Sequence, residues 1–240
     1  MTWLVLLALG VLAGTVGGVV GFGGSTILLP ALVLVFGPKE AVPIMGLAGL
    51  LANLSRVTTW WRAVDWQAAA VYSLTGVPSV ALGARLFLAL DARMVEGFLG
   101  VFMIAMVPVR RWLMARQFKI GLGGLALAGI AVGFLTGMVA STGPLSTPFF
   151  LAFGLVKGAY VATEALGSLS IFSTKSLVFQ RFGAIGVETA LKGAIIGGAM
   201  MLGSWLAKRI VERLEARQFG AIMDGVMLLA GVSMLGALWV

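Results

Sequence analysis

Long apolar segments joined by short polar connections run through the whole of this sequence. A soluble fold built from such segments would have too little polar surface, because 60% of the residues are hydrophobic and only 11% are charged. Soluble domains carry about 25% charged residues. Repeated long apolar segments are instead typical of a helical protein that crosses a membrane several times. We therefore predict an all-α membrane protein.

Hydropathy and helix-breaking residues divide each half of the chain into five segments. These are Trp3–Val20, Thr26–Phe36, Ala41–Trp61, Trp66–Leu90 and Met94–Val109, then Leu122–Ala140, Leu145–Val156, Ala159–Phe182, Val187–Ala207 and Phe219–Val240. The second segment of each half is shorter than the ~20 residues that a hydrocarbon core requires. We predict that each is the second limb of a broken or re-entrant helical hairpin. A tilted or broken span is the alternative.

A glycine-rich stretch separates the first two segments in each half. Gly14–Pro30 reads GTVGGVVGFGGSTILLP, and Gly133–Pro148 reads GFLTGMVASTGPLSTP. Irregular backbone at membrane depth is tolerated only where protein buries it or where it lines a wet cavity. Two such interruptions at corresponding places in two halves indicate the binding site of a transporter.

The two halves resemble each other beyond these stretches. Matching Gly18 to Gly137 also matches Gly24 to Gly143. We interpret residues 1–109 and 122–240 as two membrane repeats and residues 110–121 as a cytoplasmic connector. Because each repeat has an odd number of segments, the two should be inverted relative to each other.

Positively charged residues predict the orientation in the membrane, because cytoplasmic loops are enriched in them. If the first segment starts outside, the cytoplasmic connections hold Arg62, Arg110, Arg111, Arg116, Lys119, Lys157, Lys208, Arg209, Arg213 and Arg217, and the outer ones hold Lys39, Arg93 and Arg181. We therefore expect both termini outside. This distribution also explains the net charge of +8 without nucleic-acid binding.

The glycine-rich stretches predict anion binding. A short helix that begins near Ser25 or Leu145 would direct its first N–H groups into the turn, and helix N-termini attract anions. Glycines would let a ligand approach the backbone, and hydroxyls could donate hydrogen bonds. The candidate ligands are Gly21, Gly23, Gly24, Ser25, Thr26, Ser141, Thr142, Gly143 and Ser146. The row Gly10, Gly14 and Gly18 is interpreted as close helix packing instead.

Arg56 and Lys175 occupy nearly corresponding places inside predicted spans. Asn53 and Thr59 share a helix face with Arg56, and Ser168 shares one with Lys175. A cation in hydrocarbon costs at least about 2.5–3.5 kcal/mol, so it is usually retained for a partner or a substrate. We include all five residues in the candidate anion site. Extension of the two long side chains to the interface is the alternative.

Glu164 and Asp224 are the acidic residues inside predicted spans. Each is a candidate for proton coupling or a partner of a basic residue. The chain has no cysteine and no histidine, so thiolate, serine–histidine and zinc–histidine chemistry are excluded. Nucleotide-binding P-loop motifs are also absent from the sequence. We predict a protein that is not an enzyme and that needs no metal and no cofactor.

The chain resembles the sulfite exporter TauE/SafE family of small bacterial anion transporters. The similarity is carried by GVVGFGGSTILLPALVLVFG, WRAVDW and GVPSVALGARLFLAL in the first half, and by GMVASTGPLSTPFFLAFG, STKSLVFQRFGAIG and KGAIIGGAMMLGSWLAKRI in the second. The glycine–proline motif of the family corresponds to Gly21, Gly23, Gly24, Pro30, Gly143 and Pro148. The second copy departs from the motif at Ser141, Thr142 and Pro144.

This resemblance implies export of sulfite, a sulfonate or a related organosulfur or organic acid across the bacterial inner membrane. We expect a multi-pass, gradient-driven carrier that works by alternating access. Its expected partners are a small anion, the lipid bilayer, and a proton or Na⁺ as coupling ion, and a homodimer is compatible with the sequence. An anion channel, a carrier of another small solute and a cation carrier that uses Glu164 and Asp224 are the alternatives.

Overall fold

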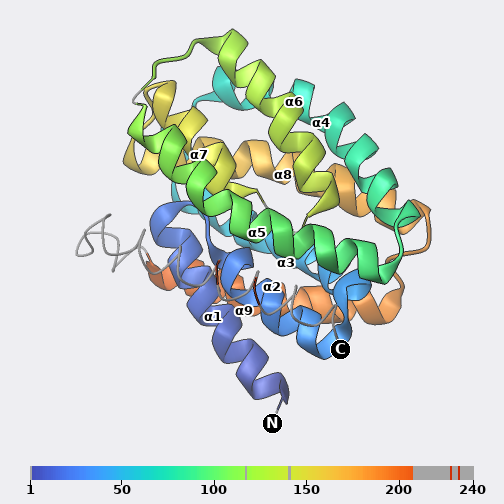
Figure 1. The fold of residues 1–240 in the computed structure, drawn as a ribbon. Helices are drawn as coiled ribbons and strands as arrows, with labels where there is room; N and C mark the ends of the chain where they lie inside the picture. The colour runs from blue at the N-terminus through green and yellow to red at the C-terminus, as the bar shows by residue number, and fades with distance from the viewer. Residues whose placement is uncertain (1, 117, 140–141, 208–227, 229–231, 233–240) are drawn as a thin grey trace.

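The computed structural model describes residues 2–116, 118–139, 142–207, 228 and 232, and this part of the chain is helical without strands (Figure 1). The helices are α1 (Thr2–Val20), α2 (Gly24–Phe36), α3 (Pro38–Thr59), η1 (Trp61–Ala63), α4 (Trp66–Ala89), α5 (Ala92–Ala115), α6 (Leu122–Met138), α7 (Gly143–Ala152), α8 (Lys157–Arg181) and α9 (Val187–Ala207).

The segments expected from the sequence up to Val187–Ala207 each coincide with a helix. Two boundaries differ by a turn or more, because α7 ends at Ala152 rather than at Val156 and α5 ends at Ala115 rather than at Val109. Residues 110–115 read RRWLMA, and arginine, leucine, methionine and alanine are good helix formers, so nothing there ends the helix. The segment Phe219–Val240 lies outside the described residues.

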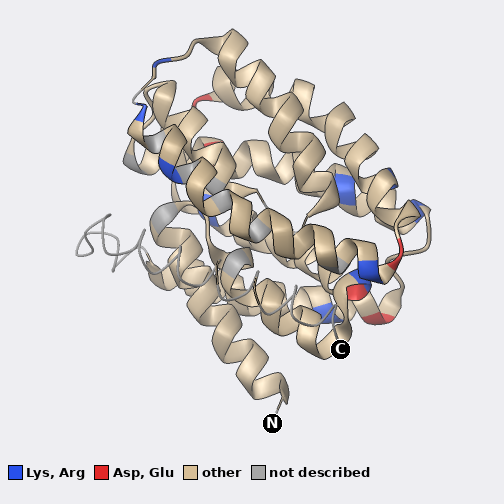
Figure 2. Cartoon of the chain, in the orientation of Figure 1, with Lys and Arg blue, Asp and Glu red and all other residues tan. Residues whose placement is uncertain are grey.

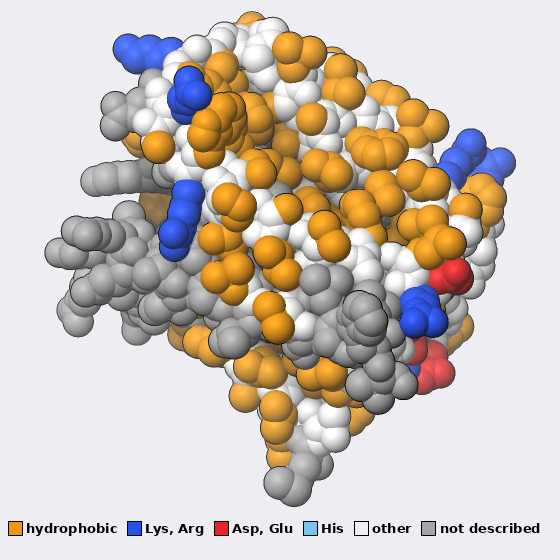
Figure 3. All heavy atoms as spheres, in the orientation of Figure 1, with side chains coloured by type: hydrophobic (Ala, Val, Ile, Leu, Met, Phe, Trp, Pro, Cys, Tyr) orange, Lys and Arg blue, Asp and Glu red, His pale blue; other side chains and the backbone are white. Residues whose placement is uncertain are grey.

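Within the described part of the chain, five helices are long and apolar enough to cross a membrane, over Thr2–Val19, Pro38–Thr59, Trp66–Ala89, Ala92–Leu113 and Val187–Ala207. Charged residues gather at the two ends of the bundle in Figure 2. Between these ends, the face drawn in Figure 3 is covered mainly by hydrophobic side chains. This distribution suits a bundle with an apolar middle band and two charged rims.

The polar helix α8 lies inside the bundle, where α3, α4 and α7 pack against it. The side chains of residues 160–165 are all buried, including those of Thr163 and Glu164. A helix that carries buried polar groups is stable within a membrane when neighbouring helices shield it from lipid.

Each half begins with a helical hairpin. In the first, α2 folds back along α1, so that the rings of Trp3 and Phe36 lie 6.0 Å apart at its open end. In the second, the Ile120 N–H, just before α6, donates to the Ala152 carbonyl at the end of α7 over 3.1 Å. The open end of the first hairpin lies next to the start of α3, because Gly37 connects α2 directly to α3. The second opens at the other end of α3, where Gly158 packs against Trp60.

Glycines allow the closest helix contacts. A Cβ atom on Gly14 would lie 2.0 Å from the Met200 carbonyl oxygen of α9, and one on Gly18 would lie 2.7 Å from the Cβ of Ala207. The packing contacts expected of Gly10, Gly14 and Gly18 are therefore confirmed, but Gly14 and Gly18 also line a cavity, which the sequence did not predict. A similar contact joins α4 to α6, where a Cβ on Gly83 would lie 2.1 Å from the Phe134 carbonyl oxygen.

Two further cations lie at the end of the bundle where the first hairpin opens. The Lys192 ammonium is 2.7 Å from carboxylate oxygens of both Glu40 and Glu188, and it lies 4.5 Å from the centre of the Phe36 ring. The Arg85 guanidinium stacks on Phe182. The ion pair between Glu40 of α3 and Lys192 of α9 joins residues far apart in the chain, and the sequence did not predict it.

Candidate functional site

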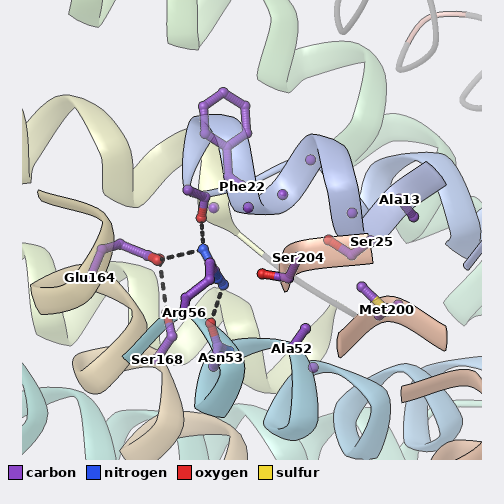
Figure 4. A pocket seen from close by; sticks show the side chains of 18 of the residues that line it. Ala13, Phe22, Ser25, Ala52, Asn53, Arg56, Glu164, Ser168, Met200 and Ser204 are labelled. Carbon is purple, nitrogen blue, oxygen red and sulfur yellow. Dashed lines mark hydrogen bonds and ion pairs between the residues drawn. The ribbon is translucent and has the colours of Figure 1, made fainter. Parts of the chain in front are cut away.

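A cavity lies where the tips of the two hairpins meet (Figure 4). Phe22, in the first tip, is so close to Gly143 in the second that a Cβ on Gly143 would lie 2.5 Å from the Cβ of Phe22. The cavity measures about 40 Å³. Since one ordered water needs roughly 10–15 Å³ by this measure, the space suits a few waters or one compact ion.

The first hairpin tip directs the start of α2 at this cavity. Gly21 and Gly23 have φ angles of 85° and 98°, which side-chain-bearing residues rarely adopt, and they turn the chain between α1 and α2. The first intrahelical hydrogen bond of α2 runs from the Ile27 N–H to the Gly23 carbonyl over 3.2 Å. The N–H groups of Gly24, Ser25 and Thr26 precede that bond, and the N-cap residue Gly23 has no side chain that could cap them. They form a set of backbone donors at a helix N-terminus.

The second tip differs from the sequence-based expectation. The Leu145 and Ser146 N–H groups donate to the Thr142 carbonyl, at 2.8 and 3.0 Å, and Pro144 has no N–H. The first turn of α7 therefore uses most of its donors internally. Its contribution to the site comes from Gly143, which lines the cavity, and from the buried hydroxyls of Thr142 and Ser146.

Arg56 supplies the positive charge of the cavity from the last turn of α3. Its guanidinium donates to the Gly21 carbonyl in the first hairpin tip and to the Asn53 side-chain oxygen one turn earlier on α3. Nη1 also lies 3.3 Å from Oε2 of Glu164 on α8. The Arg56 side chain is only 11% exposed, so it stays in the interior, and the alternative in which it extends to the interface does not describe this structure.

Glu164 is buried on the opposite side of this ion pair, with 3% of its side chain exposed. Oε1 accepts hydrogen bonds from Ser168 at 2.8 Å and from Ser146 at 3.1 Å. The carboxylate thus joins three elements, because Arg56 comes from α3 and Ser146 from α7. Such a pair, with hydrogen bonds to its remaining oxygen, is the form in which a buried carboxylate is tolerated.

A second, smaller cavity of about 10 Å³ adjoins the first on the far side of Glu164. It has roughly the volume that one water needs. Its polar lining consists of the side chains of Tyr72, Thr136, Thr142, Ser146, Glu164 and Ser168. Gly143, Glu164, Ser168 and Phe172 line both cavities, so Glu164 stands between them.

Lys175 lines neither of these two cavities. Its side chain is fully buried, and its ammonium donates to the carbonyls of Thr136 and Val139 at the end of α6. A cation there satisfies carbonyls that have no intrahelical partner and offsets the negative end of the helix. Arg56 makes the corresponding contact in the first half, because Gly21 directly follows the end of α1.

The structure brings together most of the residues that the sequence predicted. Gly21, Gly23, Gly24, Ser25, Asn53, Arg56, Gly143, Glu164 and Ser168 line the larger cavity, and Thr142 and Ser146 line the smaller one. Thr59 lies at the end of α3, outside both. Thr26 lies in α2, and its side chain is outside the described part of the structure. Ser141 and Asp224 also lie outside the described residues.

Sequence reasoning missed the contribution of α9. Ser204 lines the larger cavity, its side chain is 5% exposed, and its hydroxyl has no hydrogen-bond partner among the described residues. Met200 lines the cavity one turn earlier (Figure 4). The available signal was the one hydroxyl in the apolar stretch from Gly193 to Ala207, but hydropathy alone does not indicate which face of a helix such a residue occupies.

The model of the sulfite exporter TauE/SafE family matches residues 6–234, which is nearly the whole chain. The chain is also similar to the probable membrane transporter protein YunE of Bacillus subtilis (strain 168), with 23% identity over 271 residues that cover 98% of each protein. No solved structure matches the chain with statistical significance.

Proposed function

Because this chain belongs to the sulfite exporter TauE/SafE family, we propose that it is a gradient-driven carrier that exports a small anion. The proposed substrate is sulfite, a sulfonate or a related organosulfur or organic acid. The protein is a membrane transporter by its family and by its apolar helices. The substrate class and the mechanism are our proposals.

The observation that carries this proposal is the buried guanidinium of Arg56 at a cavity where a helix begins. Arginine stays charged inside proteins and presents several donors in a plane, which suits oxyanions. Gly24 and Ser25 at the start of α2 line the same cavity, and the partial positive charge of a helix N-terminus has the same sign as that of Arg56. A bound anion would be attracted by both the guanidinium and the helix N-terminus.

The hydroxyls and the size of the cavity support a compact oxyanion. Ser25 and Ser204 line the cavity from α2 and α9. The Ser204 hydroxyl has no partner among the residues that the structure describes, so it can donate to a ligand without breaking any of the described contacts. Roughly 40 Å³ suits an ion of about the size of sulfite and disfavours a long organic acid. The site residues are proposed as Gly24, Ser25, Asn53, Arg56 and Ser204.

We also propose that the two halves are inverted repeats. In the sequence alignment α1 corresponds to α6, and α4 corresponds to α9. Helix α1 packs extensively against α9, and α6 packs extensively against α4. The contact between α1 and α9 in one arrangement therefore has its counterpart in the contact between α6 and α4. The two hairpins open at opposite ends of α3, which also supports inversion. Movement of one hairpin against the other would open the cavity alternately to each side.

In this proposal the protein is a multi-pass protein of the bacterial inner membrane with both termini outside. Transport runs on the substrate gradient and is coupled to an ion, a proton or Na⁺, and Glu164 is the described candidate for carrying a proton. A homodimer is compatible with the proposal.

A binding and flux experiment tests the proposed function. Purified protein is screened by thermal shift against sulfite, sulfate, methanesulfonate, taurine and small carboxylates, and ligands that bind are followed as flux into proteoliposomes. We expect stabilisation by sulfite or methanesulfonate, saturable flux and counter-exchange of labelled against unlabelled anion. Flux without saturation would support a channel instead, and absence of binding by every anion would contradict an anion site.

A further inference from the structure

Glu164 occupies the place on Arg56 that a transported anion would take, and from this we infer that the protein carries one proton together with each anion. This inference rests on the proposed function, since it concerns how the anion enters the proposed site. Anion binding and protonation of Glu164 are then thermodynamically coupled, so each one is weak in the absence of the other.

The first step is the competition for Arg56. Its guanidinium donates to the Gly21 carbonyl and to Asn53, and its charge is neutralised by Glu164 at 3.3 Å (Figure 4). The arginine and glutamate side chains are 11% and 3% exposed, so water compensates neither charge well. An anion that reaches Arg56 must therefore separate this ion pair.

The second step is the charge balance of the cavity. With Arg56 and ionised Glu164 the net charge is zero, and an added monoanion would leave an uncompensated buried negative charge, which is strongly unfavourable. If Glu164 is protonated instead, Arg56 is left unpaired, and a monoanion restores neutrality. Because binding couplings are reciprocal, the proton favours the anion by the same factor by which the anion favours the proton.

The third step is a place for the neutral carboxyl group. Oε1 of Glu164 already faces Ser168 at 2.8 Å and Ser146 at 3.1 Å, beside the smaller cavity of about 10 Å³. Hydroxyls donate to a carboxylate and can accept from a protonated carboxyl, so these serines serve both states. Rotation of the side chain toward the smaller cavity would free Arg56 for the anion.

The surroundings make Arg56 and the ligand the main charges that control Glu164. From α4, Tyr72 interacts with Glu164 electrostatically, and from α8 Tyr160 does the same while its hydroxyl bonds to Thr147 at 2.7 Å. Both are neutral at ordinary pH. Apart from Arg56, Glu164 and Tyr72, the described residues that line the two cavities carry no ionisable side chain.

The consequence is electroneutral co-transport of a monoanion and a proton. A pH difference drives flux, whereas the membrane potential does not, because the loaded and empty cavities carry the same net charge. Net export occurs when the outward gradient of the anion exceeds the inward gradient of protons.

Equilibrium binding of methanesulfonate, measured between about pH 5 and pH 8, tests the inference, because this probe keeps a single negative charge over that range. In the wild type we expect the affinity to rise by up to about tenfold for each unit by which the pH falls. The variant Glu164→Gln mimics the protonated carboxyl, so it should bind tightly at all pH values and lose this dependence. Glu188→Gln, an exposed carboxylate outside both cavities, is the control and should behave like the wild type.

Flux provides the second readout. Methanesulfonate uptake into proteoliposomes should acidify the lumen in the wild type, without dependence on a clamped potential, and should become potential-dependent and proton-independent in Glu164→Gln. If Glu164→Gln is unstable, methanesulfonate should raise its melting temperature more than that of the wild type.

The outcomes separate the inference from the function on which it rests. Binding that does not depend on pH in the wild type, or that keeps its pH dependence in Glu164→Gln, would overturn the proton coupling and leave the anion site intact. Absence of methanesulfonate and sulfite binding by both proteins would overturn the anion site and the coupling together.

Discussion

At the residue scale, Arg56 and Lys175 are two cations in the described interior, and their surroundings differ. Arg56 faces a cavity and a carboxylate, whereas the Lys175 ammonium is surrounded by carbonyls at the end of α6. A cation beside free space can exchange its partner for a ligand. A cation enclosed by carbonyls acts mainly on the stability of the helix end. A direct role of Lys175 in anion binding stays a prediction from the sequence.

Substitution of Arg56 should abolish anion binding. Arg56→Ala removes the buried charge and leaves Glu164 unpaired, so we also expect a loss of about 3–5 kcal/mol in the free energy of unfolding at neutral pH. The double variant Arg56→Ala/Glu164→Gln removes both charges and should recover much of this stability without recovering binding. Titration with sulfite and thermal melts of both variants check this, and sulfite binding by the double variant would contradict the role of Arg56.

Ser204 should contribute to affinity and not to stability. Its hydroxyl has no partner among the described residues, so Ser204→Ala should leave the melting temperature unchanged or slightly higher. If the hydroxyl bonds to the anion, its removal should weaken binding by roughly two- to tenfold, which corresponds to one hydrogen bond. Ser176 is the matched control, since it is also buried and unpartnered but lines neither cavity. Equal affinities of the two alanine variants would contradict a role of Ser204.

Lys175→Met should distinguish support of α6 from contact with the anion. We expect it to leave the carbonyls of Thr136 and Val139 without their donor and to lower stability by about 1–3 kcal/mol. The sulfite dissociation constant of the folded protein should stay unchanged. A weaker affinity together with unchanged stability would assign Lys175 to the anion site instead.

At the element scale, the site depends on helices that approach each other more closely than side chains normally permit. Glycines on α1 and α6 let these helices pack against the backbones of α9 and α4. The two hairpin tips then reach the middle of the bundle, where Phe22 meets Gly143. Helix packing and the position of the cavity are therefore linked, because a larger spacing between the helices would separate the tips.

A glycine substitution at the contact between α4 and α6 should test this link away from the cavity. Gly83→Ala places a methyl group 2.1 Å from the Phe134 carbonyl oxygen, and we expect a loss of about 1–3 kcal/mol through overpacking. Gly123→Ala on α6 is the control, because nothing lies within 4 Å of its Cβ position. That variant should be neutral or more stable by up to about 1 kcal/mol. Thermal melts in detergent measure both, and similar melting temperatures would contradict a close contact.

At the scale of the whole molecule, charge and polarity are distributed as a membrane requires. The middle band of the face shown in Figure 3 is apolar, the charged residues lie mainly at the ends, and the polar α8 is surrounded by other helices. The bundle has two chemically similar ends, so its orientation in the membrane depends on the excess of basic residues in the connections.

Cysteine labelling should establish this orientation, since the chain has no cysteine of its own. Gly121 and Gly186 lie in connections at opposite ends of the bundle, and both have open space at the Cβ position. In intact cells a membrane-impermeant maleimide should label Gly186→Cys and should label Gly121→Cys only after permeabilisation. The reverse pattern would place both termini on the cytoplasmic side.

The sequence by itself determined the helical membrane class, the positions of most helices, the two interruptions and most of the residues around the cavity. Hydropathy, glycine content and charges within apolar segments can be read from short stretches of sequence. A bilayer strongly penalises unpaired backbone groups and isolated charges, so these local features are enough to predict where helices and interruptions lie. Only the tertiary structure decided that Glu164 of α8 meets Arg56 of α3, that Lys175 faces the end of α6, and that Ser204 joins the cavity from α9. These contacts join residues distant in the chain, and they depend on how the helices are rotated and packed, which the pattern along one helix does not specify.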